Sequence, residues 1–249
     1  MSDTRPEGLQ NIKHIVAVAS GKGGVGKSTT AVNMALAMAQ AGFKVGILDA
    51  DIYGPSQGLM LGIAEGSHPE TMDEKWFVPI QAHGVSVMSM AFLVDANSPM
   101  VWRGPMAAGA LQQMLLQTNW GELDYLFVDM PPGTGDIQLT LCQKAQVSGA
   151  VIVTTPQDLA LLDARKGIEM FKKVNVPVLG IVENMSTHVC SQCHHEEAIF
   201  GAGGGVALAQ QYGTELLASL PLSMEIRVLV DGGTPSVVAD PTSAAAKTY

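Results

Sequence analysis

Basic residues are scarce in this 249-residue chain. Only 14 lysines and arginines stand against 23 acidic residues, no stretch clusters them, and the formal net charge at pH 7 is −9. Nonspecific binding to nucleic acids depends on basic side chains that neutralise phosphates. The composition therefore argues against a nonspecific nucleic-acid binder, although a local basic face stays compatible with it.

The chain also has no export signal, no long apolar run and few cysteines. Its first ten residues are polar and include Pro6 and Gly8, and no apolar run is long enough to span a bilayer. Three cysteines are an odd, small number, which is typical of a reducing compartment and not of a disulfide scaffold. We therefore expect a cytoplasmic protein without a membrane partner.

Apolar segments alternate along a chain that is 47% hydrophobic and 15% charged. Several runs are continuous and β-branched, as in parallel strands covered on both faces. We expect strands at residues 14–19, 44–49, 85–89, 125–129, 149–154 and 178–183. We expect helices at residues 28–41, 105–118, 137–144, 159–174 and 205–212. This order predicts an α/β fold with a doubly wound, mostly parallel sheet, helices on both faces, and nucleotide at the carboxyl ends of the strands.

The expected domain organisation is simple. Residues 1–11 are predicted to form a flexible N-terminal tail, and residues 12–249 a single domain. Residues 61–79 are polar and irregular, which indicates a surface excursion, and Gly42 is a suitable stop for the first helix. Residues 240–243 look like a helix start with barely one turn after it, as in a truncated C-terminal helix.

Residues 21–29 predict a site for nucleotide phosphates. They read Gly-Lys-Gly-Gly-Val-Gly-Lys-Ser-Thr after an apolar run, which is G-x-x-x-x-G-K-[ST] between a strand and a helix. The glycines let backbone N–H groups surround a phosphate, Lys27 can reach the β- and γ-phosphates, and the Ser28 hydroxyl can bind Mg²⁺. A mere glycine-rich turn would not require the full motif. The predicted nucleotide-binding residues are Gly21, Lys22, Gly23, Gly24, Val25, Gly26, Lys27, Ser28 and Thr29.

Two further polar residues extend this predicted site. Lys22 stands where an ordinary phosphate loop requires no lysine, and it could reach outward to a nucleotide held by another subunit. Asn184 follows the strand expected at residues 178–183 and has the donor and acceptor that reading an adenine edge requires. Asparagine is also common where a strand turns, so Asn184 alone is a weak signal.

Acidic residues follow two other expected strands. Asp49 and Asp51 end the second strand, where one could polarise the attacking water and the other support Mg²⁺ through water. Asp129 ends an apolar strand, like the second magnesium-binding acid of phosphate-loop enzymes. Gly133, in the proline- and glycine-rich segment that follows, could donate its N–H to the γ-phosphate. The alternatives are an ordinary polar strand end and a rigid connector.

Cys190 and Cys193 form a C-x-x-C pair, flanked by His188, His194 and His195. This spacing lets two thiolates bind one metal ion or a cluster. Two histidines would complete a structural zinc site, whereas a two-fold dimer would assemble the four thiolates of an iron–sulfur cluster. A thioredoxin-like redox pair and two incidental cysteines fit this context less well. The third cysteine, Cys142, is expected inside a helix.

Together these segments resemble the Mrp/NBP35 (ApbC-like) family of iron–sulfur cluster carrier ATPases, within the MinD-like class that has a deviant phosphate loop. The likeness runs from about Ile12 to the C-terminus. Its most specific parts are Asp-Ile-Tyr-Gly-Pro-Ser, at residues 51–56, and the C-x-x-C that follows Glu-Asn-Met. The other matching segments are residues 20–29, 102–105 (Trp-Arg-Gly-Pro), 129–136 and 200–204.

The resemblance implies a phosphate-loop fold of the MinD and nitrogenase-iron-protein type, a single ATPase domain and slow ATP hydrolysis. Lys22 would contact nucleotide across a dimer interface, and Asp51 would assist hydrolysis. The implied catalytic residues are Lys22, Lys27 and Asp51. The implied ligands of Mg²⁺ are Ser28, Asp49 and Asp129.

The resemblance also implies a cargo and partners. A homodimer would bridge a [4Fe–4S] cluster through Cys190 and Cys193 of both subunits and transfer it to apo iron–sulfur proteins. No nucleic-acid or membrane partner is expected. The main rival is a partition or division-site ATPase with a structural metal at the cysteine pair. Such proteins tend to carry a basic amphipathic C-terminal helix, which residues 244–247 (Ala-Ala-Ala-Lys) do not show.

Overall fold

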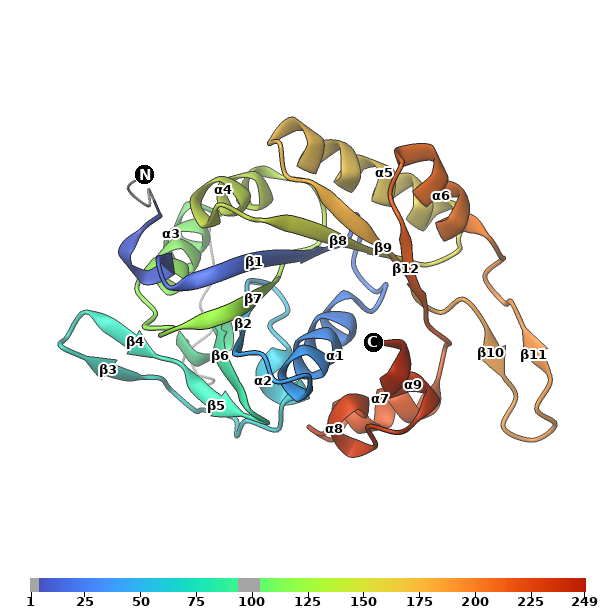
Figure 1. Cartoon of the computed structure of the whole chain (residues 1–249), viewed down its shortest axis with the longest axis horizontal. Coiled ribbons are helices and arrows are strands. Elements are labelled where there is room, and N and C mark those ends of the chain that lie inside the picture. Colours follow the sequence, from blue (N-terminus) through green and yellow to red (C-terminus); the bar gives the residue numbers. More distant parts are fainter. Residues whose placement is uncertain (1–4, 94–103) are drawn as a thin grey trace.

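A central eight-stranded sheet organises the computed structural model, which describes residues 5–93 and 104–249. The strand order is β12-β9-β8-β1-β7-β2-β6-β5, and helices lie on both faces (Figure 1). All neighbouring strands are parallel except the edge pair β5 and β6. The predicted doubly wound α/β fold is therefore confirmed.

The six expected strands are all present, with ends that differ by two residues or fewer. The sheet strands are β1 (Ile12–Ala19), β2 (Val45–Asp49), β5 (Ile80–Ala82), β6 (Val85–Ser89), β7 (Leu123–Asp129), β8 (Gly149–Thr154), β9 (Val178–Glu183) and β12 (Leu216–Ser219). Both β2 and β8 are buried along their whole length, because helices cover both faces of the sheet.

The five expected helices are also present. The helices are η1 (Glu7–Leu9), α1 (Lys27–Gln40), α2 (Gln57–Met60), η2 (Met90–Leu93), α3 (Gly104–Leu116), α4 (Asp136–Ala145), α5 (Asp158–Lys173), α6 (Gly204–Tyr212), α7 (Met224–Asp231), α8 (Ser236–Ala239) and α9 (Ala244–Thr248). Gly42 ends α1 as predicted: its φ is 94°, and its N–H donates to the Ala39 carbonyl at 3.0 Å.

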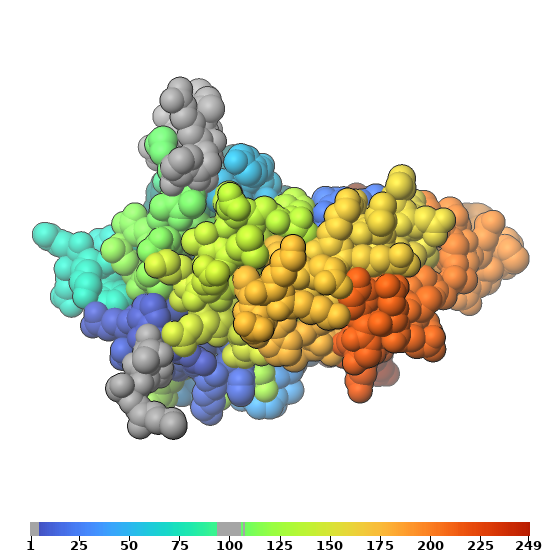
Figure 2. Space-filling view, turned by 90° about the horizontal axis from the view of Figure 1, so that it is seen from above, coloured from blue at the N-terminus to red at the C-terminus, as the bar shows by residue number. Residues whose placement is uncertain are grey.

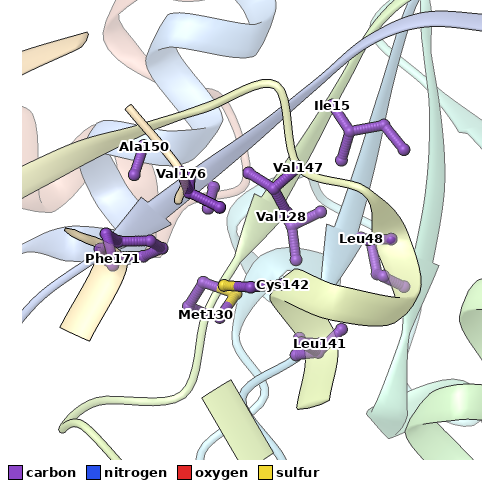
Figure 3. Close-up of a cluster of buried hydrophobic side chains, with 14 of the residues drawn as sticks. Ile15, Leu48, Val128, Met130, Leu141, Cys142, Val147, Ala150, Phe171 and Val176 are labelled. Atoms are coloured by element: carbon purple, nitrogen blue, oxygen red, sulfur yellow. The ribbon is translucent and has the colours of Figure 1, made fainter. Parts of the chain in front are cut away.

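The strands bury side chains on both faces of the sheet. Along β1, Ile15 and Ala17 pack into one core cluster, whereas Val16 and Val18 pack into the other. This division follows from the two-residue period of a strand. The first cluster lies under α3, α4 and α5, and Figure 3 shows part of it. The second lies under α1.

The N-terminal segment differs from the expected loose tail. Residues 7–9 form η1, and the Leu9 side chain is completely buried in the first core cluster. Lys75 also forms an ion pair with Glu7 at 3.0 Å. The ordered structure therefore begins before residue 12. That residues 12–249 form a single domain stays a prediction.

The region expected to be irregular contains a hairpin. Strands β3 (Glu70–Met72) and β4 (Trp76–Val78) pair antiparallel, and Asp73 and Glu74 turn the chain with φ of 54° and 53°. A hairpin turn with two positive φ angles normally carries Asn-Gly or Asp-Gly. The Asp-Glu pair at residues 73–74 therefore does not predict this turn from the sequence. A second hairpin, β10 (His188–Val189) and β11 (Glu196–Glu197), lies at the opposite end of the long axis (Figures 1 and 2).

Candidate functional site

The phosphate loop joins the end of β1 to the start of α1. At Gly26 the φ is 82°, and an added Cβ would lie 2.1 Å from the side-chain nitrogen of Asn184. An added Cβ at Gly21 would lie 2.1 Å from the Asp163 carbonyl of α5. Gly26 is thus required by its backbone conformation and by close packing, and Gly21 by close packing. The loop presents its N–H groups at the head of a 14-residue helix.

Lys27 lies at the head of α1 among acidic groups. Its side chain is only 6% exposed, and its ammonium donates to the Asp129 carboxylate and, at 3.2 Å, to the Ser28 hydroxyl. The second acid, Asp51, lies 3.8 Å from the ammonium. A buried ammonium needs such partners. An arriving phosphate would have to replace the ion pair with Asp129.

Asp49 anchors the loop that follows β2. One of its oxygens accepts hydrogen bonds from the Ser56 and Gln57 N–H groups and the Ser89 hydroxyl, at 2.8–3.0 Å. The other accepts the Asp51 N–H at 3.2 Å. Complete burial, and then the charge of Asp129, raise the pKa of Asp49 to about 7. Both oxygens of Asp49 accept hydrogen bonds in this structure, which favours contact with a cation through water.

Asp51 lies in the loop and not on the strand. Because β2 ends at Asp49, that residue lies at the strand end as expected, whereas the expected placement of Asp51 on the strand is wrong. The side chain of Asp51 is 13% exposed and faces the Lys27 ammonium. Of Asp49 and Asp51, it is therefore Asp51 whose carboxylate accepts fewer hydrogen bonds from backbone N–H groups.

Gln57, the first residue of α2, is a site residue that sequence reasoning missed. It is fully buried, and its amide nitrogen donates to Asp129 at 2.8 Å and to the Ser28 carbonyl at 3.1 Å. Its side-chain oxygen is buried and has no hydrogen-bond partner among the described residues. An orphaned acceptor of this kind costs about 1–3 kcal/mol.

The oxygen atoms gathered here suit a magnesium ion. Mg²⁺ prefers hard oxygen ligands, keeps several waters and binds through one or two carboxylates together with phosphates. The Ser28 hydroxyl and the Asp129 carboxylate both contact the Lys27 ammonium, and the Gln57 carboxamide contacts Asp129 and the Ser28 carbonyl through its nitrogen. These residues therefore fit the predicted ion. Among the described residues they supply only part of its ligands, and phosphate oxygens and water would supply the others.

Gly133 does not have the predicted free N–H group. Its N–H donates to the Ser20 carbonyl at 3.0 Å, and its φ is 98°. The segment after β7 thus folds back on the end of β1. Gln138 also donates to the Pro132 carbonyl at 2.9 Å and holds this segment from α4. The predicted contact from Gly133 to phosphate is corrected accordingly.

A pocket of about 340 Å³ adjoins the phosphate loop. Its volume lies within the usual range for ligand sites. Asn184 lines it, and its amide donates to the Val25 carbonyl at 2.9 Å, which leaves the amide oxygen for a ligand. Most of the other walls, which sequence reasoning did not predict, come from the C-terminal part of the chain and include Met185, Pro221, Leu222, Ser223, Arg227 and Tyr249.

The predicted cysteine pair lies in the turn of the β10–β11 hairpin. The Cys190 N–H donates to the His195 carbonyl, and the His194 N–H donates to the Cys190 carbonyl, both at 2.9 Å. Both thiols are free; Cys190 is half-buried and Cys193 is exposed. Hydrogen bonds from the Cys193 and Gln192 N–H groups to the sulfur lower the pKa of Cys190. These donors favour a thiolate, which is the metal-binding form.

The histidines beside this pair do not complete a metal site in one chain. A ring nitrogen of His188 lies 3.2 Å from the Leu222 carbonyl, directed at the body of the protein. Across residues 5–93 and 104–249, no group of three or more histidine, cysteine or acidic side chains could hold a metal ion. In this part of the chain, the C-x-x-C pair and two histidines are therefore not assembled into a zinc site.

Cys142 belongs to the hydrophobic core. It is 3% exposed on α4 and lies beside Met130 and Val128 (Figure 3). Burial raises the pKa of its thiol to about 11. The expectation that Cys142 lies in a helix, apart from the other two cysteines, is confirmed.

The three thiols should react at very different rates. Under reducing conditions near neutral pH, we expect iodoacetamide to modify Cys190 first. Cys142 should react at least ~100-fold more slowly, because its raised pKa leaves that much less thiolate and its sulfur is covered. Peptide mass spectrometry over time measures the rates, with unfolded protein as the control that exposes all three. Equal rates for Cys142 and Cys190 in the folded protein would contradict these assignments.

Two remaining features of the predicted site can be placed only in part. Lys22 makes no ion pair with any residue in the described ranges, and its backbone carbonyl accepts the Ser20 hydroxyl at 2.8 Å. Trp102 and Arg103 lie outside the described residues.

Residues 5–93 and 104–249 include no helix with the length and apolar character that crossing a membrane requires.

Comparison with known proteins identifies the family. Residues 11–249 match the ParA family described as NUBPL iron-transfer P-loop NTPases. The chain belongs to this family. A Pseudomonas fragi iron–sulfur cluster carrier protein is 71% identical over 242 residues, which are 97% of this chain and 84% of that protein.

Other members of the family are similar over nearly the whole chain. The Escherichia coli K12 iron–sulfur cluster carrier protein is 60% identical over 95% of this chain, which spans 64% of that protein's length. The mouse iron–sulfur cluster transfer protein NUBPL is 51% identical over 97% of this chain and 76% of its own length. The family resemblance inferred from the motifs is confirmed.

Solved structures place the family fold among phosphate-loop proteins. A nucleotide-binding protein from Archaeoglobus fulgidus, in complex with ADP, has a TM-score of 0.80 at 41% identity; the likeness covers 91% of this chain and 89% of that one. The cell-division ATPase MinD of Pyrococcus furiosus has a TM-score of 0.69 at 23% identity, with 95% and 94% covered. The MinD likeness shows the shared fold.

Proposed function

We propose that this member of the NUBPL iron-transfer family is an iron–sulfur cluster carrier that binds and hydrolyses ATP. It would hold a [4Fe–4S] cluster between two copies of the chain and pass it to apo iron–sulfur proteins. The observation that carries the proposal is the cysteine hairpin: two free thiols at one end of the molecule, with no further metal ligands assembled around them in the described residues.

Four thiolates are the usual requirement of a [4Fe–4S] cluster, and each chain supplies two at the hairpin. A two-fold axis at the hairpin tip would complete the set with the same residues from each subunit. Cys142 is buried in the core and takes no part. The cluster is cargo, so an exposed, short turn is a suitable place from which to hand it over.

The phosphate loop would bind ATP, with the base in the pocket beside Asn184 and the phosphates over the head of α1. Ser28 and Asp129 would hold Mg²⁺, with Asp49 acting through water. Because the Lys27 ammonium already stands at this point, it needs only to exchange Asp129 for phosphate oxygens. The support comes from the pocket volume, the helix terminus and the cluster of oxygen atoms.

Hydrolysis would use two further groups. Asp51 faces the Lys27 ammonium from the loop after β2, and we assign it the orientation of the attacking water. Lys22 has no ion-pair partner among the described residues, and we assign it to the phosphate of a nucleotide in the other subunit, where it would act like an arginine finger. The assignment of Lys22 depends on the dimer, whereas that of Asp51 depends on a contact within one chain.

The nucleotide pocket and the cysteine hairpin share one segment of backbone. Leu222 lines the pocket, and its N–H donates to the Thr187 carbonyl at 2.7 Å, one residue before β10. Its carbonyl lies 3.2 Å from a ring nitrogen of His188, the first residue of that strand. A ligand that displaces Leu222 would therefore move the base of the hairpin. We propose that this contact couples the nucleotide state to the cluster.

The rival function, a partition or positioning ATPase, is not favoured. Its support would be the MinD fold, but fold alone does not specify function. Relatives of more than half identity are named as cluster carrier or transfer proteins. We propose a cytoplasmic carrier with no nucleic-acid or membrane partner, consistent with the net charge of −9.

Anaerobic reconstitution tests this function. The purified chain is incubated with ferrous iron, sulfide and a reducing agent, desalted, and assayed for iron, sulfide and zinc. We expect about two irons per chain, which is four per dimer, and the absorbance of a [4Fe–4S] cluster. Stoichiometric zinc in place of iron, or no bound metal, would contradict the carrier function.

A further inference from the structure

The buried side chain of Gln57 joins two parts of the phosphate site. Its amide nitrogen donates to one oxygen of Asp129 and to the Ser28 carbonyl, at 2.8 and 3.1 Å. Both partners are acceptors only, so the NH₂ group and not the oxygen must face them. The side chain therefore ties the end of β7 to the first turn of α1.

The two oxygens of Asp129 have different partners. Lys27 donates to one, and Gln57 donates to the other. If Lys27 turns to a phosphate, the first oxygen loses its partner, whereas Gln57 continues to hold the second. The carboxylate thus keeps its orientation at the moment when one of its oxygens becomes free for a cation or its water.

The carboxamide oxygen of Gln57 is left over. It is buried and has no donor among the described residues, although glutamine oxygens in protein interiors are ordinarily bonded. The carboxamide that contacts Ser28 and Asp129 through its nitrogen thus keeps a free acceptor, which is suited to a donor that arrives with the ligand. Water bound to a cation is such a donor, because the ion polarises its O–H groups.

We propose that Gln57 is a positioning residue for the magnesium ion that accompanies the nucleotide. Its NH₂ group fixes Asp129 and the Ser28 turn, and its oxygen accepts a hydrogen bond from a water of the hydrated ion. The proposal rests on the proposed ATP binding and names a residue that supports it. Gln57 would touch neither the phosphates nor the attacking water.

The test replaces Gln57 by methionine, which has nearly the same shape but neither the donor nor the oxygen acceptor. The affinity for a fluorescent ATP analogue is measured in EDTA and across a magnesium titration. We expect unchanged affinity in EDTA and a magnesium-dependent gain that is about tenfold smaller than in the parent protein, the effect of one hydrogen bond to a charged assembly. Iron loading should stay unchanged.

Two further variants keep the test decisive. Ser236→Ala removes another buried, unpartnered oxygen, far from the phosphate loop in sequence, and should leave the magnesium dependence intact. Gln57→Asn, whose carboxamide is one methylene short, should show the loss if the methionine variant does not fold. A full magnesium effect in the folded Gln57 variants, or an equal loss of affinity in EDTA, would overturn the proposal. A parent protein without any magnesium effect would instead refute the proposed ATP site as well.

Discussion

Replacing Cys190 or Cys193 by alanine is expected to abolish stable cluster binding after anaerobic reconstitution. Each substitution removes two of the four thiolates from a symmetric dimer, and two thiolates do not hold a [4Fe–4S] cluster. The iron content of the desalted protein, with the absorbance spectrum, measures the loss. ATP binding should survive, because the phosphate loop is at a separate site on the chain.

Matched controls separate ligand loss from disruption of the hairpin. Ser191→Ala lies in the same turn and should retain the cluster. Cys142→Ala should also retain it, although the cavity left in the core should lower the thermal stability. Full iron in Cys190→Ala or Cys193→Ala would refute the ligand assignment, as would loss of iron in the Ser191 control.

Replacing Lys22 by alanine or Asp51 by asparagine is expected to lower the kcat of ATP hydrolysis by about 10²–10³-fold. Lys22 would stabilise charge that develops on the transferred phosphoryl group, and Asp51 would orient the water. Both interactions strengthen in the transition state, so the affinity for ATP should change only slightly. Steady-state kinetics and equilibrium binding of a fluorescent ATP analogue measure the two quantities separately.

The choice of control matters for Lys22, since any lysine lost from an acidic protein could weaken ATP binding. Lys75→Ala removes an exposed lysine of the β3–β4 hairpin, whose ion-pair partner is Glu7. This substitution should change neither kcat nor the affinity for ATP. Normal kcat in both Lys22→Ala and Asp51→Asn would refute the hydrolytic mechanism, even with the family assignment correct. A large loss of ATP affinity would place these residues in ground-state binding.

Much of the fold could be predicted because its signals are local. Continuous apolar runs make up most of β8 and β9 and the second half of β1, and glycines mark both the phosphate loop and the end of α1. The acids Asp49 and Asp129 end parallel strands, so the sequence predicted that both lie at the carboxyl edge of the sheet; the structure adds that the two strands are neighbours with the acids in register. In the same way, C-x-x-C spacing alone placed two thiols in one turn.

The missed features depend on contacts between distant segments. Gln57 looks like an ordinary polar residue, and only the loop anchored by Asp49 carries it into the interior beside Asp129. The pocket wall at residues 221–223 follows β12, a short edge strand of alternately half-buried and exposed residues. Gly133 was misjudged because nothing local shows that its N–H meets the Ser20 carbonyl.

A heterodimer tests the bridged cluster most directly. Wild-type chains with one affinity tag are mixed with Cys190→Ala/Cys193→Ala chains that carry another, in the presence of a non-hydrolysable ATP analogue. After anaerobic reconstitution, tandem purification isolates the mixed dimer, and its iron is compared with that of a doubly tagged wild-type dimer. We expect iron near background in the mixed dimer, because only two of the required thiolates remain. A full cluster in the mixed dimer would show that one subunit suffices and would contradict the bridging arrangement.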